Sequence, residues 1–135
     1  PRMLRTPTYH VFHMYKYHQY ADLVESYLDG VETIGEEKEY MVPSLQESVS
    51  IDKEGILTIT LNNLSVDKDE PVEITFAECQ TKEVTAAILN NEMHAYNTFE
   101  DPDKVHEEVF SNYTVENGMI RFTMPASSVV QFRVR

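Results

Sequence analysis

The stretch GILTITLNN, residues 55–63, determines the fold class, because its apolar residues alternate along the chain. Leu57, Ile59 and Leu61 fall on one side of an extended backbone, whereas Ile56, Thr58 and Thr60 fall on the other. This pattern is typical of a β-strand. The preceding residues DKEG, at 52–55, have the composition of a turn, and LQESVSI, at 45–51, also reads as a strand. The two strands are therefore predicted to form a hairpin.

Further strand-like segments follow at regular intervals. They are PVEITF (71–76), EVTAAILN (83–90), EEVFSNYTV (107–115), GMIRFTM (118–124) and SVVQFRVR (128–135). The alanines of residues 83–90 leave a helix possible there. The pair Asn117-Gly118 predicts a tight turn. Many short strands separated by turn signals predict an antiparallel β-sandwich, with a solvated acidic loop at 32–40 and a long connection at 97–105.

A helix is predicted ahead of the strands, from residue 7 to about residue 20. Thr6 suits the N-cap, and Pro7 suits the first helical position, where no backbone hydrogen bond is lost. One side of this helix would carry Val11, Met14 and Tyr15, with Phe12 at its margin. The opposite side would carry Tyr9, Tyr17, Tyr20, His10 and His13. Because both sides bear large side chains, we expect both to be buried, one of them against a neighbour that this chain does not contain.

Composition excludes several classes of function. The chain has 135 residues, about one domain, and a net charge of −12. Its 11 Lys and Arg residues are too few and too scattered to bind nucleic acid or an anionic membrane. No apolar run reaches the roughly 18 residues of a membrane span, and no leader-like segment opens the sequence. The single cysteine, Cys79, is expected to be structural. No cofactor is expected.

His10 and His13 are three residues apart, so they could share one helical face and bind a metal. A catalytic zinc site needs a third protein ligand, and His18 lies too far around the helix to provide it. The two-histidine helix signature with its glutamate is also absent. Packing or hydrogen bonding of these histidines is the favoured interpretation, and no metal site is predicted.

Four stretches resemble the C-terminal region of glycoside hydrolase family 51 α-L-arabinofuranosidases. The most specific is TPTYHVFHMYKYHQYA (6–21), which is similar to the last helix of the family's catalytic barrel. VPSLQESVSIDKEGILTITLNNL (42–64) resembles its first sandwich hairpin, and MIRFTMPASSVVQFRVR (119–135) resembles its terminal strand. MHAYNTFEDPDKV (93–105) matches a further segment, except that Ala95 and Tyr96 intrude after His94. The resemblance spans nearly the whole chain.

The resemblance implies a barrel helix at residues 1–20 and a jelly-roll-like sandwich at 21–135. Family members remove terminal α-L-arabinofuranosyl groups from arabinan and arabinoxylan by a retaining mechanism with two glutamates. Both glutamates would lie upstream, so this chain is expected to contain no catalytic residue and to brace the barrel. Its partners would be that barrel and, through it, an arabinose-containing polysaccharide or oligosaccharide. Tyr9 and His10 are expected to line the substrate pocket of the larger enzyme.

The pair Asn91-Glu92 is similar to the acid/base pair of many retaining glycosidases, but it falls in a predicted loop with no partner carboxylate. Two alternatives to the bracing role remain open: an independent carbohydrate-binding module and a metal-binding domain. An open strand edge beside an uncovered helix face also predicts a dimer or an exchanged helix. The compartment is left open among cytoplasmic, periplasmic and secreted.

Overall fold

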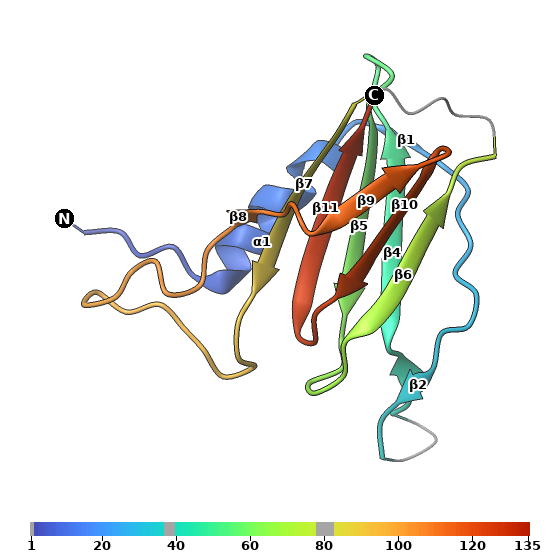
Figure 1. Cartoon of the computed structure of the whole chain (residues 1–135). Helices are drawn as coiled ribbons and strands as arrows, with labels where there is room; N and C mark the ends of the chain where they lie inside the picture. The colour runs from blue at the N-terminus through green and yellow to red at the C-terminus, as the bar shows by residue number, and fades with distance from the viewer. Residues whose placement is uncertain (1, 37–39, 78–82) are drawn as a thin grey trace.

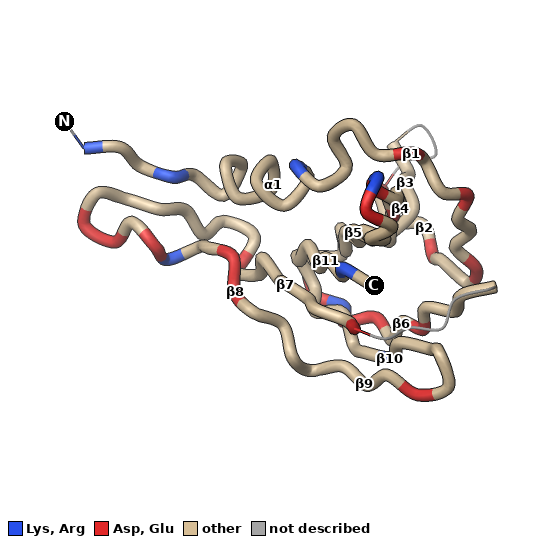
Figure 2. Tube along the Cα trace, turned by 90° about the horizontal axis from the view of Figure 1, so that it is seen from above, with Lys and Arg blue, Asp and Glu red and all other residues tan. Residues whose placement is uncertain are grey.

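The chain folds into two antiparallel β-sheets packed face to face, with one helix on the outer side of the larger sheet (Figures 1 and 2). The computed structural model describes residues 2–36, 40–77 and 83–135. Cys79 and part of the acidic loop at 32–40 lie outside these residues. The predicted mainly β sandwich with one preceding helix is confirmed. Within the described residues, no helix is long and apolar enough to cross a membrane.

The larger sheet has the strand order β1-β4-β5-β11-β7-β8 among the described residues. Its strands are β1 (Asp22–Leu23), β4 (Leu45–Ile51), β5 (Leu57–Asn63), β11 (Ser128–Val134), β7 (Val84–Asn90) and β8 (Glu108–Val109). The smaller sheet has the order β6-β10-β9, with β6 at Glu70–Thr75, β10 at Met119–Met124 and β9 at Tyr113–Glu116. A separate short ribbon joins β2 (Thr33–Ile34) to β3 (Val42–Pro43). The short strands β1, β2 and β3 lack a clear sequence pattern and were not predicted.

Both predicted hairpins are confirmed. β4 and β5 pair along their full length, and the Asp52 carboxylate accepts hydrogen bonds from the backbone N–H groups of Glu54 and Ile56 in the turn. In the β9–β10 turn, Asn117 and Gly118 have φ angles of 51° and 75°. Asparagine and glycine tolerate this left-handed region, as a two-residue hairpin turn requires. Residues 84–90 form strand β7 and not a helix, because β11 pairs with them throughout.

The predicted strand at 107–115 is wrong as a single element. Its first part is β8, which pairs with β7 in the larger sheet, and its last part is β9, which pairs with β10 in the smaller sheet. Phe110 lies between them with its ring buried in the core, while its backbone N–H donates to the carbonyl of Ala86. Burying this ring between the layers moves the chain from one sheet to the other.

The predicted helix is shorter than expected. Helix α1 spans Pro7–Tyr15 and is followed by a single 3₁₀ turn, η1, at Lys16–His18. The Thr6 cap is confirmed, since its hydroxyl accepts a hydrogen bond from the Tyr9 backbone N–H at 3.3 Å. After η1 the chain becomes extended, and Tyr20 has a φ of 61°. The tighter turn brings the His18 ring down onto the larger sheet, where it bonds to two strands.

The main core fills the space between the two sheets. β11 and β5 contribute apolar residues from the larger sheet, and β10 contributes them from the smaller sheet. The buried members are Leu45, Val49, Ile59, Leu61, Phe110, Ile120, Phe122, Met124, Val130, Phe132 and Val134. The Phe132 ring lies 4.9 Å from the Phe122 ring and 5.3 Å from the Tyr113 ring, measured between centroids.

The opposite face of the larger sheet is also buried, by polar side chains at its centre and by a smaller apolar cluster of Met14, Leu89 and Val105. Thr58 and Thr60 are 1% and 0% exposed because α1 and η1 cover this face. The Gln131 side-chain amide donates to the Met14 carbonyl at 2.7 Å and to the Thr60 hydroxyl at 2.8 Å. His18 bonds to the Thr60 hydroxyl at 2.8 Å, and the Tyr15 hydroxyl accepts from the amide of Asn62. Directed hydrogen bonds therefore fix the position of the helix.

Candidate functional site

Helix α1 and the segment before β8 enclose a cavity of about 270 Å³ beside the first turns of the helix. Tyr9 and His10, which were expected to line a substrate pocket, both face this cavity, and so does His13. The remaining lining residues are Arg5, Asp103, His106 and Glu107. We call this space the histidine cavity.

Two stretches that are far apart in sequence form the wall of the histidine cavity. The residues before α1 and the connection between β7 and β8 run side by side away from the sheets (Figures 1 and 2). Buried Asn97 joins them, because its amide donates to the carbonyls of Arg5 and Val105 at 2.8 and 2.7 Å. Its side-chain oxygen also accepts from the Val105 backbone N–H. We call residues 2–6 and 91–105 together the arm.

Glu107 links the two histidines of α1. Its Oε1 lies 2.7 Å from Nδ1 of His13 and 3.5 Å from Nδ1 of His10. On the other side of the His13 ring, Nε2 lies 2.8 Å from the Lys16 ammonium. An ammonium group only donates, so Nε2 accepts and the proton of a neutral His13 sits on Nδ1, from which it is donated to Glu107. The arrangement couples helix α1 to the start of β8.

His10 has an unused hydrogen-bonding atom. The residue is 6% exposed, and its Nε2 is buried without a partner among the described residues. The Tyr9 ring meets the His10 ring edge-on at 5.4 Å and lies nearly parallel to the His13 ring at 6.0 Å. An unpaired buried polar atom costs about 1–3 kcal/mol. A hydrogen-bond partner for this nitrogen would therefore stabilise the structure.

The remaining histidine of this region, His18, lies outside the cavity. Burial lowers the pKa of His18 below its usual value of 6.5, and its two ring nitrogens bond to the hydroxyls of Ser50 and Thr60. His18 thus contacts the sheet and not the histidine cavity. In the described ranges, no three His, Cys, Asp or Glu side chains are grouped so as to hold a metal ion. His10 and His13 instead approach Glu107.

Glu92 lies in the loop after β7, where its side chain is exposed. The backbone N–H of Glu92 donates to the Asn91 side chain, and its carbonyl accepts from Ala95, so backbone groups make both bonds. Sequence reasoning missed Glu107, which lies 94 residues after His13. No local pattern marks such a pairing, because it depends on the path of the arm.

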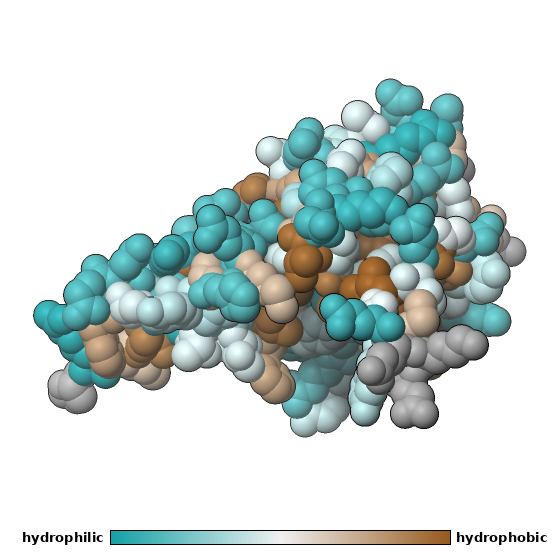
Figure 3. Space-filling model, turned by 90° about the horizontal axis from the view of Figure 1, so that it is seen from below, coloured by the Kyte–Doolittle hydropathy of each residue, from teal (hydrophilic) through white to brown (hydrophobic). Residues whose placement is uncertain are grey.

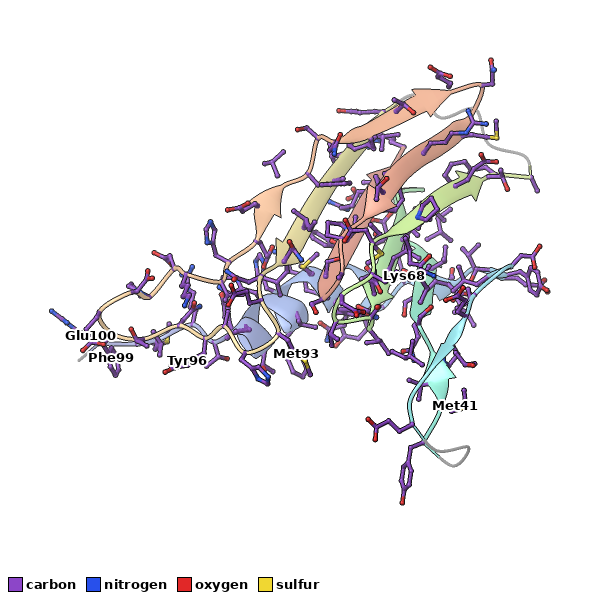
Figure 4. All side chains as sticks on the ribbon, turned by 60° about the horizontal axis from the view of Figure 1, so that its bottom comes forward. Met41, Lys68, Met93, Tyr96, Phe99 and Glu100 are labelled. Atoms are coloured by element: carbon purple, nitrogen blue, oxygen red, sulfur yellow. The ribbon has the colours of Figure 1, made fainter. Side chains whose placement is uncertain are left out.

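The surface beside the histidine cavity is rich in exposed apolar side chains. On α1, Phe12 is 74% exposed and Tyr9 is 42% exposed. Only His10 and Met14 of α1 are buried in this chain, so the expected burial of both sides of the helix would need a neighbour beyond the described residues. On the arm, Met93, Tyr96 and Phe99 are exposed and lie in a row (Figure 4). Figure 3 shows apolar residues interspersed with polar ones along the part of the molecule that projects from the sheets.

Comparison with known proteins identifies the domain family of the chain. A family model described as the α-L-arabinofuranosidase C-terminal domain matches residues 1–128. The chain is 30% identical over 134 residues to an intracellular exo-α-L-arabinofuranosidase of Bacteroides ovatus. That match covers 98% of this chain but 26% of the relative, so the chain spans about a quarter of its length.

Solved structures agree with this assignment. A GH51 arabinofuranosidase from Xanthomonas axonopodis pv. citri superimposes with a TM-score of 0.87 at 27% identity, covering 96% of this chain and 26% of that protein. An α-L-arabinofuranosidase from Thermotoga maritima, solved as an arabinose complex, gives a TM-score of 0.79 at 22% identity, with coverage of 96% and 29%. The second likeness supports the fold alone. The resemblance inferred from the four sequence stretches is thereby confirmed, and the chain belongs to the C-terminal domain family of GH51 α-L-arabinofuranosidases.

Proposed function

We propose that this chain is the non-catalytic, barrel-supporting domain of a larger α-L-arabinofuranosidase. The larger enzyme would remove terminal α-L-arabinofuranosyl groups from arabinan or arabinoxylan by a retaining mechanism. Two glutamates of a catalytic barrel would carry out that reaction, one as nucleophile and the other as acid and then base. The residues of this chain would hold the barrel in place and take no part in bond cleavage.

The unequal burial of helix α1 carries this proposal. One side of α1 is fixed to the sandwich by buried Met14 and by the hydrogen bond from Gln131. The other side exposes the Phe12 ring to solvent. A helix anchored on one side with a large apolar residue on the other is suited to lie between two bodies. The arm adds further exposed aromatic residues, Tyr96 and Phe99.

The histidine cavity would lie at the border between this domain and the barrel. Tyr9 and His10 would line the substrate pocket there, and the free Nε2 of His10 would accept a hydrogen bond from a barrel group or a sugar hydroxyl. Residues 1–20, which include helix α1, would then belong functionally to the barrel, and residues 21–135 would form the sandwich domain. Association of the isolated chain into a dimer stays a prediction.

The proposal is tested by release of p-nitrophenol from p-nitrophenyl α-L-arabinofuranoside. We expect activity from the full-length enzyme and none from the 135-residue chain. In the full-length enzyme, Phe12→Asp should shorten the half-life of activity at elevated temperature, because a charge would be buried against the barrel. The matched variant Tyr27→Asp, at a residue that is 86% exposed away from α1, should leave the half-life unchanged.

Activity of the 135-residue chain alone would overturn the proposal, and Glu92→Gln would then show whether Glu92 is responsible. An unchanged half-life for Phe12→Asp would instead show that the exposed side of α1 does not contact the barrel. The two results separate the absence of catalysis in this chain from its bracing role.

A further inference from the structure

The outer face of the smaller sheet carries a shallow groove of about 490 Å³. This sheet packs on the face of the larger sheet opposite to the one that α1 covers (Figure 2). The groove therefore lies on the far side of the sandwich from the histidine cavity and from the exposed side of α1. A barrel docked on α1 would leave this groove open to solvent.

Polar side chains from all three strands of the smaller sheet converge on the groove. The pairing places Glu73 of β6, Arg121 of β10 and Thr114 of β9 in one row across the sheet. Thr123 of β10 lies in the next row, opposite Pro71. Side chains at alternate positions share one face of a sheet, so these residues all point outward, and each is exposed.

Most hydrogen-bonding groups of the groove have no partner among the described residues. The Nε of Arg121 donates to Oε2 of Glu73 at 2.7 Å, and its Nη2 lies 3.9 Å from the sulfur of Met119. The hydroxyls of Thr114 and Thr123 and the amide of Asn112 have no hydrogen bond to another residue in the part of the chain that the structure describes. The groove thus offers donors and acceptors side by side.

The charges of the groove and of the whole chain disfavour an anionic ligand. Arg121 is already paired with Glu73, whose hydrogen bond raises the pKa of the guanidinium, so no uncompensated positive charge is available for an anion. The net charge of −12 disfavours an anion further. A neutral molecule with many hydroxyl groups uses both donors and acceptors, and it can rest an apolar face on the exposed ring of Pro71.

We propose that this groove binds a neutral oligosaccharide, with Arg121, Glu73 and Asn112 as its principal hydrogen-bonding residues. The substrate class rests on the proposed function, since a hydrolase of arabinose-containing polymers would be held on its polymer by a second contact. Because the groove is open, binding is weak, with a dissociation constant on the order of 1 mM.

Titration of the ¹⁵N-labelled 135-residue chain with arabinotriose, followed by NMR, tests the proposal. We expect saturable shifts in the backbone signals of residues 71–73, 111–114 and 121–123. Arg121→Gln should weaken binding by at least about tenfold, the effect of removing hydrogen bonds made by a charged group. Xylotriose and cellotriose, titrated in parallel, show whether the groove selects arabinose or accepts neutral sugars in general, and either result supports the proposal.

Two threonines of the same sheet provide a matched control. Thr123→Val, within the groove, should weaken binding, whereas Thr75→Val, exposed on β6 outside the groove, should not. The proposal would be overturned if none of the three sugars shifted the groove signals at 10 mM, if the shifts fell instead on Tyr96 and Phe99, or if Arg121→Gln bound as tightly as the wild type. None of these results bears on whether the full-length enzyme hydrolyses p-nitrophenyl α-L-arabinofuranoside, so the two proposals fail independently.

Discussion

The two faces of the larger sheet are both buried, but they are buried by different means. The inner face meets the smaller sheet through apolar side chains such as Phe132, Ile59 and Val130. The outer face meets α1 and η1 through the hydrogen bonds of Thr60 and Gln131, beside a smaller apolar cluster that contains Met14. The central strands β5 and β11 each supply residues to both faces, since Thr60 and Gln131 alternate with these apolar residues.

The two faces therefore contribute differently to the stability of the fold and to the position of α1. Apolar contacts are non-directional, so the inner face gives a large stabilisation that tolerates small displacements. Hydrogen bonds depend on distance and angle, so those of the outer face restrict the position of α1 more closely than apolar contacts alone would. We infer that the sandwich supplies the free energy of folding, while the polar junction sets where the exposed side of α1 and the histidine cavity lie.

The largest effect is expected from Phe132→Ala on the inner face. Phe132 is 0% exposed, and its ring contacts those of Phe122 and Tyr113. Removing it should lower the free energy of unfolding by about 3–5 kcal/mol. Urea denaturation measures this change, with Phe99→Ala on the exposed arm as the matched control at less than about 0.5 kcal/mol. Equal effects for the two variants would refute the assignment of the core.

A smaller effect, confined to the helix, is expected from Gln131→Met on the outer face. The substitution keeps the length of the side chain but leaves the Met14 carbonyl and the Thr60 hydroxyl without the amide donor. The expected cost is about 1–3 kcal/mol. Hydrogen exchange should become faster in α1 and stay slow in β5 and β11. Gln46→Met, at an exposed residue of β4, is the control. Uniformly faster exchange across the sheet would contradict the separation of the two faces.

The smallest effect is a dependence of stability on pH that arises from His18. Burial lowers the pKa of folded His18, so the unfolded chain takes up a proton more readily than the folded chain. The contribution of His18 is fully present above pH 6.5 and is lost as the pH falls from 6.5 through the folded pKa. Urea denaturation at several pH values should show a shallower decline for His18→Gln than for the wild type. An NMR titration midpoint of His18 at or above 6.5 would contradict this account.

Sequence patterns predicted the inner face better than the outer one. Alternation in residues 55–63 gave the strand, and Asn117-Gly118 gave a turn, because both signals depend on neighbours in sequence. The burial of Thr58 and Thr60 could not be read from their residue types, since threonine also suits an exposed strand face. The break within residues 107–115 was hidden for a related reason, because the crossing at Phe110 depends on the second sheet.

The histidine cavity was likewise predictable only where its residues are close in sequence. The Thr6 cap and the spacing of His10 and His13 placed these side chains near one another, and the resemblance drew attention to Tyr9 and His10. Glu107 could not be found, because its pairing depends on the Asn97 bonds that hold the arm against the residues before α1. That Tyr9 and His10 line a substrate pocket remains a prediction.

The last strand to be synthesised, β11, lies in the middle of the larger sheet. β11 lies between β5 and β7, so neither of these strands completes its pairing until residues 128–134 have been synthesised. Helix α1 emerges long before, yet the amide that binds its Met14 carbonyl belongs to a residue 117 positions later. Contacts so distant in sequence slow folding, because the chain entropy of a long loop must be lost first. During synthesis, therefore, the early helix and the open edges of β5 and β7 depend on protection from aggregation until the last strand inserts.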